Sequence, residues 1–362
     1  MSRRRFLQHV TLGGAAMLAL GERAMAAEPA RKLGVALVGL GNYSRGELGP
    51  ALRLTKHCHL TGVVTGDAAK GARWAADYGF PEKNIYGYDA MSRLADNPDI
   101  DIVYVVTPNG LHAEHSIAAA RAGKHVICEK PMANTVAECD AIMAACEKAG
   151  VRLSIGYRLH FDPYHEVLRE FVRTGECGPF MKMSGGFAFE MNSRAWRIDK
   201  ALAGGGPLMD LGVYVIQESC MATKASPVAV TAREIPKKKP ELFNEVEEGI
   251  EWTLEFSDGA LAKGLTSYND RANNFRADAD RGWFELQSAY IYRNLRGATH
   301  KGPLQFSPEV NQQALQMDDF AECVKTGRAT PVPGEMGRRD MQIVEAIYAS
   351  AASDGARVEI KA

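Results

Sequence analysis

Short apolar runs alternate with amphipathic stretches through the first part of the chain. Runs with the length and apolar character of buried strands occupy residues 35–38, 59–64, 102–106, 125–128 and 152–155. Helical spacing of apolar residues fills about 45–56, 111–121 and 135–149. Apolar strands joined by helices predict a parallel sheet covered on both faces, whose ligand lies beyond the carboxyl ends of the strands.

The pattern changes beyond about residue 157. Residues 250–256 alternate between apolar and polar side chains, as a strand with one covered face does. The turn Ser257-Asp258-Gly259 follows, and a second strand runs from it toward Tyr268. Further short strands and then two helices are expected at 275–292, 311–326 and 336–352.

A glycine turn joins the first predicted strand to the first helix. In Gly39-Leu40-Gly41-Asn42-Tyr43-Ser44, Gly39 permits the turn and Gly41 lets a pyrophosphate approach the helix amino terminus. The third glycine position holds Ser44. We therefore predict an α/β protein with a Rossmann dinucleotide-binding domain over residues 27–156. An α+β domain with an open, mainly antiparallel sheet is predicted over 157–362.

The end of the second strand indicates which dinucleotide binds. An NAD enzyme has an acidic residue there, whereas this chain has Thr65-Gly66, with Lys70 in the first turn of the next helix. A hydroxyl and an ammonium suit a 2′-phosphate, so the sequence favours NADP. The alternative is that Asp67 binds the ribose and Lys70 is a solvated surface residue.

The amino terminus has the pattern of an export signal. Arg3-Arg4-Arg5-Phe6-Leu7 precedes an apolar run and Ala24-Met25-Ala26, so residues 1–26 are expected to be a twin-arginine signal peptide and the protein periplasmic. The apolar run is shorter than the about 20 residues that span a bilayer.

Composition narrows the remaining function classes. A formal net charge of −1 without a basic stripe argues against nucleic acid as a partner. The seven cysteines show no metal-ligand spacing, and Cys139 and Cys146 lie too far apart on one predicted helix to form a disulfide. His112 and His115 have helix-face spacing, but nothing else supports a ligand pair, so no metal is predicted.

Four motifs in order resemble the Gfo/Idh/MocA oxidoreductases. They are the glycine turn, the run from Thr107 to Glu114, Glu129-Lys130-Pro131-Met132, and the glycine-rich stretch from Gly204 to Gly212. Within the family, the chain is most similar to the glucose-fructose oxidoreductase group. That closer similarity rests on Thr65 with Lys70, Gly156-Tyr157-Arg158, Trp196-Arg197, and Tyr214, where most members carry a histidine.

Candidate catalytic residues follow from the chemistry of sugar oxidation. Asp210 and Tyr214 are four residues apart in a predicted helix and therefore share one face. Hydride leaves C1 of a sugar only as the hydroxyl proton is removed, and a tyrosine can accept it when a cation such as Lys130 favours its deprotonated form. We assign Tyr214 as acid/base, Lys130 as its electrostatic partner and substrate ligand, and Asp210 as orienter of the sugar. The alternatives are an exposed turn lysine, a buried structural carboxylate and a core tyrosine.

The resemblance implies further contacts to the cofactor. Besides the glycine turn, Thr65, Gly66 and Lys70, it implies Tyr88, Thr107, Asn109, Leu111, His112, Glu129, Lys130, Arg158, Trp196, Arg197 and Tyr292. Trp196 could equally anchor the stem of Arg197 in a domain interface, and His112 could simply orient its loop.

The resemblance also implies an activity. It implies an NADP-dependent aldose oxidoreductase that moves hydride between sugar C1 and tightly bound NADP, recycles it with a second sugar or carbonyl, and forms a homodimer or homotetramer. The short stretch from Ala27 to Arg31 leaves cofactor retention open, because glucose-fructose oxidoreductase has a long arm there. An NAD-dependent redox-assisted glycoside hydrolase and a non-catalytic sugar or cofactor sensor remain alternatives, and the sequence names no particular sugar.

Overall fold

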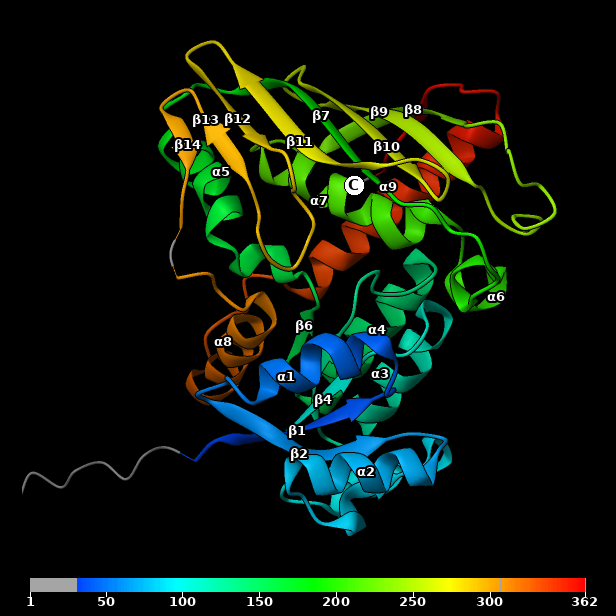
Figure 1. The fold of residues 1–362 in the computed structure, drawn as a ribbon, viewed down its shortest axis with the longest axis vertical. Helices are drawn as coiled ribbons and strands as arrows, with labels where there is room; N and C mark the ends of the chain where they lie inside the picture. The colour runs from blue at the N-terminus through cyan, green and yellow to red at the C-terminus, as the bar shows by residue number, and fades with distance from the viewer. Residues whose placement is uncertain (1–30, 307, 362) are drawn as a thin grey trace, which may run out of the picture. The chain divides into compact units, whose positions relative to one another are not determined.

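The computed structural model describes residues 31–306 and 308–361, so the predicted signal peptide lies outside the described residues. From Lys32 onward the chain forms one unit built around two sheets (Figure 1). The sheets and their helices place side chains from distant parts of the sequence around one cavity, which is described below.

The first sheet has six parallel strands in the order β3-β2-β1-β4-β5-β6. The strands are β1 Leu33–Val38, β2 Cys58–Val64, β3 Ile85–Tyr86, β4 Ile102–Val105, β5 His125–Cys128 and β6 Leu153–Ile155. Its connections include α1 Gly49–Leu52, α2 Ala68–Tyr78, α3 His112–Arg121 and α4 Val136–Ala149. The predicted parallel sheet is confirmed. The helical segment after β1 ends at Leu52, where the Thr55 hydroxyl donates to the Leu52 carbonyl (2.8 Å).

Successive residues of β1 point to opposite faces of the sheet, as the period of a strand requires. Val35 and Leu37 pack in one apolar cluster, and Ala36 and Val38 in another. The cluster around Val35 is completed by α8 Gln312–Thr326, a helix from the end of the chain. The predicted boundary after residue 156 therefore separates α8 in sequence from the sheet that it covers.

The second sheet has nine strands in the order β14-β13-β12-β11-β7-β10-β9-β8-β15. They are β7 Phe180–Ala188, β8 Pro227–Glu234, β9 Gly249–Phe256, β10 Leu261–Ser267, β11 Ala272–Ala279, β12 Gly282–Leu286, β13 Gly297–Thr299, β14 Gly302–Leu304 and β15 Val358–Glu359. All neighbours are antiparallel except β7 and β10, which pair in parallel. The sheet is therefore mixed, although mainly antiparallel as predicted.

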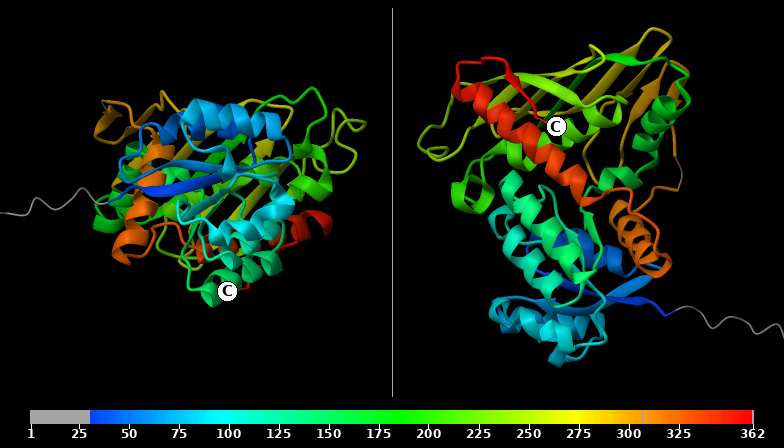
Figure 2. Two further views of the ribbon diagram at one scale, coloured as in Figure 1. Left: turned by 90° about the horizontal axis from the view of Figure 1, so that it is seen from below. Right: turned by 180° about the vertical axis from the view of Figure 1, so that it is seen from behind.

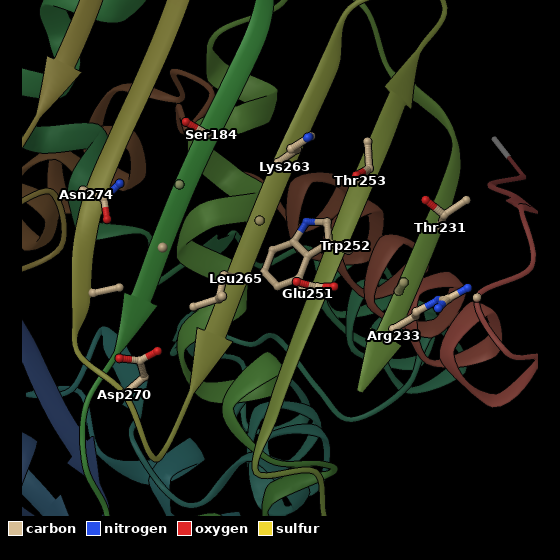
Figure 3. Close-up of a pocket in the computed structure, with 16 residues that line it drawn as sticks. Ser184, Thr231, Arg233, Glu251, Trp252, Thr253, Lys263, Leu265, Asp270 and Asn274 are labelled. Atoms are coloured by element: carbon tan, nitrogen blue, oxygen red, sulfur yellow. The ribbon is translucent and has the colours of Figure 1, made fainter. Parts of the chain in front are cut away.

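Helices cover one face of the second sheet. The remaining helices are α5 Pro163–Thr174, α6 Lys200–Ala203, α7 Val213–Met221 and α9 Gly334–Ala352, of which α5, α7 and α9 lie against the sheet (Figure 1, Figure 2). No helix of the described residues covers the opposite face. Side chains such as Ser184, Thr253 and Lys263 line a hollow of 640 Å³ there (Figure 3).

A buried carboxylate holds the glycine-rich turn that leads into α7. Glu247 accepts hydrogen bonds from the backbone amides of Gly206 (2.9 Å) and Leu208 (3.0 Å) and from the Tyr348 hydroxyl (2.9 Å). A Cβ on Gly206 would lie 2.2 Å from the Glu247 carbonyl oxygen, and one on Gly205 would lie 2.0 Å from the Tyr348 hydroxyl. Close approach to Glu247 and Tyr348 therefore explains two of the three glycines.

We expect Gly206→Ala to lower the free energy of unfolding by about 1–3 kcal/mol, because the added methyl overlaps backbone that cannot move freely. The matched control is Gly46→Ala in the segment after β1, where a Cβ would meet no atom within 4 Å. That substitution should leave stability unchanged or raise it by up to about 1 kcal/mol. Urea unfolding of both variants measures the difference, and equal midpoints would contradict a tightly packed turn.

Candidate active site

A cavity of 410 Å³ lies at the carboxyl ends of the strands of the first sheet. Its walls come from the segments that follow β4, β5 and β6, and from β7, α7 and the segment after β12. Of the predicted site residues, it is lined by Tyr43, Thr107, Asn109, His112, Glu129, Lys130, Arg158, Trp196, Arg197, Asp210, Tyr214 and Tyr292. Residues from both sequence domains therefore meet at one site.

Lys130 follows β5, and its side chain reaches the turn before α7. Its Nζ donates to the backbone carbonyl of Asp210 (2.8 Å) and lies 3.4 Å from Asp210 Oδ1. The same Nζ lies 4.7 Å from the centroid of the Tyr214 ring. The three predicted catalytic residues are therefore adjacent, with the ammonium between the carboxylate and the phenol ring.

Asp210 is the charge that fixes this arrangement. Its Oδ2 accepts from Arg197 Nε (2.9 Å) and from the Tyr268 hydroxyl (3.0 Å). Burial acts to raise the pKa of this carboxyl, but Lys130, Arg197 and the Tyr268 hydrogen bond together hold it below its usual value. Asp210 is therefore ionised and bound by protein donors on both oxygens, and its predicted contact with a sugar stays a prediction.

Tyr214 lies in the first turn of α7, 9% exposed. Its ring meets Phe187 edge-on, with centroids 5.5 Å apart, and lies 5.8 Å from the Tyr290 ring. Arg158 flanks it as well, with Cζ 5.1 Å from the ring centroid. Packing fixes the ring, and two cations flank it.

The glycine turn after β1 has the features of a dinucleotide cradle. Gly39 has a φ of 98°, which favours glycine, and the Ser44 hydroxyl donates to its carbonyl (2.6 Å). This hydrogen bond explains why a serine serves at the third glycine position. A Cβ on Gly41 would point into open space, so the backbone there is free to approach a ligand. These residues fit a pyrophosphate.

A second cavity of 450 Å³ lies beside this turn and is rich in cations. Arg45, Lys70 and Arg73 line it together with Gly41 and Asn42. Asp67 caps α2 instead, since its Oδ1 accepts from the Lys70 amide (2.9 Å). Thr65 is buried, and its hydroxyl oxygen accepts from the Asp67 amide (3.2 Å). The cavity therefore offers positive charge to an anionic group.

Other predicted cofactor residues lie outside both cavities. Tyr88 stacks on His115 with ring centroids 5.0 Å apart and borders Gly66 at the end of β2. Tyr88 and Gly66 line neither cavity, and the same holds for Leu111 and Thr65. Their predicted contacts with the cofactor stay predictions.

His112 orients its loop. Its ring nitrogens face the carbonyls of Thr107 and Pro131, each at 2.8 Å, and burial lowers the pKa of the ring to about 4. The neutral ring donates one hydrogen bond and fixes the loop after β4 against the loop after β5. The guanidinium of Arg197 lies over the Trp196 ring, 4.6 Å from its centroid, and this contact helps to position Arg197 for its hydrogen bond to Asp210.

Sequence reasoning missed several residues of the site. Phe187, Phe189, Met191 and Ile291 form an apolar wall, and Arg45 and Arg73 add charge to the second cavity. Arg73 carried a local signal, because it lies three residues after Lys70 on α2. Arg45 lies four residues after Gly41 in the helical segment that follows the glycine turn, and the apolar wall forms only when β7 and the segment after β12 reach the first sheet.

Residues 31–306 and 308–361 hold no grouping of three or more side chains suited to a metal ion. None of the helices within these ranges combines the length and apolar character that a membrane span needs. All seven cysteines are free thiols, including Cys139 and Cys146.

Known proteins share this arrangement. A family model described as "Oxidoreductase family, NAD-binding Rossmann fold" matches residues 33–157, and "GFO/IDH/MocA C-terminal domain" matches residues 165–285. A crystal structure of aldose-aldose oxidoreductase from Caulobacter crescentus, complexed with glycerol, is 40% identical. It superposes with a TM-score of 0.88 over 91% of this chain and 100% of that chain.

Two curated relatives are named as NADP(+) enzymes. D-xylose 1-dehydrogenase (NADP(+)) 2 from Haloferax volcanii is 31% identical over 322 residues, which cover 86% of this chain and 94% of that protein. D-xylose 1-dehydrogenase [NADP(+)] from Haloarcula marismortui is 26% identical over 324 residues, covering 86% and 89%. With both family models matched and similarity that spans nearly all of these relatives, the chain belongs to the Gfo/Idh/MocA family of NAD(P)-binding oxidoreductases.

Proposed function

We propose that the protein is an NADP-dependent sugar oxidoreductase that acts at C1 of an aldose. The observation that carries this proposal is the cluster of Lys130, Asp210 and Tyr214 in a cavity beyond the strands of the first sheet. The relatives named aldose-aldose oxidoreductase and D-xylose 1-dehydrogenase support the substrate class.

Tyr214 is the proton acceptor in this proposal. The ammonium of Lys130 favours the phenolate form of Tyr214. As the C1 hydroxyl becomes a carbonyl, its proton passes to this phenolate oxygen, which leaves a neutral phenol. Asp210 keeps Lys130 in place, since it binds the ammonium through both its carbonyl and its carboxylate. Bound NADP supplies the acceptor of the C1 hydride.

The cationic cavity beside the glycine turn supports NADP over NAD. Arg45, Lys70 and Arg73 would hold the 2′-phosphate, and the Thr65 hydroxyl lies at the strand end where an NAD enzyme has a carboxylate. Asp67 is engaged as the amino-terminal cap of α2, which argues against its binding the ribose.

Contacts across the cofactor cleft support retention of NADP between a sugar oxidation and the reduction of a second sugar or carbonyl. The Tyr43 and Tyr292 rings lie 5.9 Å apart, and Arg293 pairs with Glu47 at 3.0 Å. Tyr43 and Glu47 belong to the glycine turn and its helix, whereas Tyr292 and Arg293 follow β12. These pairs form a strap over the cleft, which slows release of the cofactor.

Assembly and location complete the proposal. The uncovered face of the second sheet is where we expect a second copy to bind in a homodimer or homotetramer (Figure 3). The twin-arginine pattern at the amino terminus supports action in the periplasm, where little free NADP is available.

Removal of the proton acceptor should abolish oxidation. Tyr214→Phe and Lys130→Met are each expected to lower the single-turnover rate of NADP reduction by about 10²–10⁴-fold, because each removes part of the acid/base pair. The measurement is absorbance at 340 nm after D-xylose or D-glucose is mixed with NADP-loaded protein. Tyr164→Phe, a tyrosine outside the cavity, is the matched control and should react at the wild-type rate. Wild-type rates in Tyr214→Phe would contradict the assignment.

Removal of the cations in the second cavity should weaken the binding of NADP but not that of NAD. Lys70→Ala and Arg73→Ala should each raise the Kd for NADP by about tenfold, the equivalent of one lost charge-assisted hydrogen bond, with the Kd for NAD unchanged. Quenching of tryptophan fluorescence by each nucleotide measures both values. An equal rise in the Kd for NAD would show that the cavity binds a part of the cofactor that NAD and NADP share, and not the 2′-phosphate.

Opening the strap should speed NADPH release. Arg293→Glu is expected to raise the release rate about two- to fivefold, in line with a partly exposed ion pair. The double variant Glu47→Arg/Arg293→Glu restores opposite charges and should restore the slow rate. NADPH fluorescence decay after mixing with excess NADP gives these rates, and equal rates in all three proteins would exclude the ion pair as a strap.

A further inference from the structure

Arg158 carries a buried positive charge that has no acid partner at ion-pair distance. The residue follows β6 and is 2% exposed. Its guanidinium donates to the carbonyls of Tyr290 (2.5 Å) and Ile291 (3.2 Å) and to the side-chain oxygen of Gln312. The ion pairs of the described residues do not include Arg158. Neutral oxygens therefore hold the cation without cancelling its charge.

The hydrogen bonds of Arg158 reach a carboxylate only through Gln312. Gln312 donates through its Nε2 to Asp162 Oδ2 at 2.7 Å, so an amide separates the guanidinium from this acid. Lys130 is in the opposite situation, because Asp210 lies 3.4 Å from its ammonium. Arg158 therefore lacks the direct ion pair that Lys130 has.

That potential acts on Tyr214. The Arg158 Cζ lies 5.1 Å from the Tyr214 ring centroid and 4.4 Å from that of Tyr292. Burial acts to lower the pKa of Arg158, but its interactions with the hydroxyls of Tyr214, Tyr292 and Tyr43 raise it above its ordinary value. The guanidinium therefore lies close enough to Tyr214 for its charge to act on the phenol oxygen.

Other charged and titratable groups also face Tyr214. These are the cation Lys130, the carboxylates Asp210 and Glu129, and the phenols Tyr43, Tyr290 and Tyr292. Asp210 is bound to Lys130 and Arg197, and burial raises the pKa of Glu129, which accepts from the Tyr104 hydroxyl (2.6 Å). Arg158 acts on Glu129 as well, since it helps to lower the pKa of that carboxyl, but Arg158 forms no ion pair with a carboxylate of the described residues.

We propose that Arg158 is a positioning residue that acts through Tyr214: its uncompensated guanidinium stabilises the phenolate that accepts the substrate proton, and it does not bind the cofactor phosphates. The proposal rests on the proposed function, because it assumes the role of Tyr214. It reassigns Arg158 from the cofactor contacts that the sequence implied. Its Nη1 donates to Ile291 and Gln312 and its Nη2 to Tyr290, which holds the guanidinium against the segment after β12 and α8, while the buried Nε has no hydrogen-bond partner.

Charge and shape can be separated at this position. Arg158→Met removes the charge but keeps much of the length, whereas Arg158→Lys keeps the charge. Each is compared with the same protein carrying Tyr214→Phe, so that the difference in tyrosinate absorbance at 295 nm follows Tyr214 alone. We expect the titration midpoint of Tyr214 to rise by about 1–2 pH units in Arg158→Met and by less than half as much in Arg158→Lys.

The same shift should appear in catalysis. The acid limb of the pH profile of kcat for sugar oxidation should move upward by the same amount in Arg158→Met, while the Kd for NADP stays within about twofold. An unchanged midpoint, or equal shifts in the Met and Lys variants, would overturn the proposal in favour of a packing role. A higher Kd for NADP with an unchanged midpoint would restore the cofactor role of Arg158.

A second variant tests the same electrostatic effect with Arg158 intact. If Arg158→Met does not fold, Gln312→Glu places a carboxylate against the intact guanidinium, and the proposal then requires the midpoint of Tyr214 to rise in that variant. The titration needs no turnover, so it separates the two hypotheses. A shifted midpoint together with an active Tyr214→Phe would reject the proposed function and leave the electrostatic coupling intact.

Discussion

The ionised Asp210 carboxylate is the interaction on which the site depends. It binds Lys130 from the edge of the first sheet, and Arg197 and Tyr268 from the second half of the chain. A buried carboxylate without such partners would be protonated or would destabilise the fold. With them, it fixes the distance between the two halves at the cavity and holds an ammonium beside a phenol ring.

A second buried carboxylate supports the first. Glu247 binds the backbone of the turn that carries Asp210, and Tyr348 of α9 binds Glu247. Burial raises the pKa of Glu247, and its hydrogen bonds to two amides and a hydroxyl counter that effect. The geometry of the proposed catalytic cluster is therefore set by hydrogen bonds beneath the turn that carries Asp210, which is the kind of support that preorganised catalysis requires.

Local patterns allowed prediction where short-range rules decide the outcome. The glycine turn, the strands of the first sheet, Lys130 at a strand end and the shared face of Asp210 and Tyr214 all follow from spacing within a few residues. The apolar wall of Phe187 and Met191 and the parallel pairing of β7 with β10 could not be predicted, because partners distant in sequence determine them. The isolated charge of Arg158 escaped notice for the same reason.

The position of α8 has a consequence for how the protein is made. Ala314, Met317 and Phe320 complete the core on one face of the first sheet, and Asp318 accepts from the amides of Lys56 (2.9 and 2.8 Å) and His57 (2.8 Å). A ribosome releases β1 to β6 long before it releases this helix, so the nascent nucleotide-binding half exposes an apolar face until residues 312–326 emerge. The half that binds the dinucleotide is therefore not an exchangeable module. A recombination event that joins it to another carboxyl-terminal half must also bring a helix that fits this face.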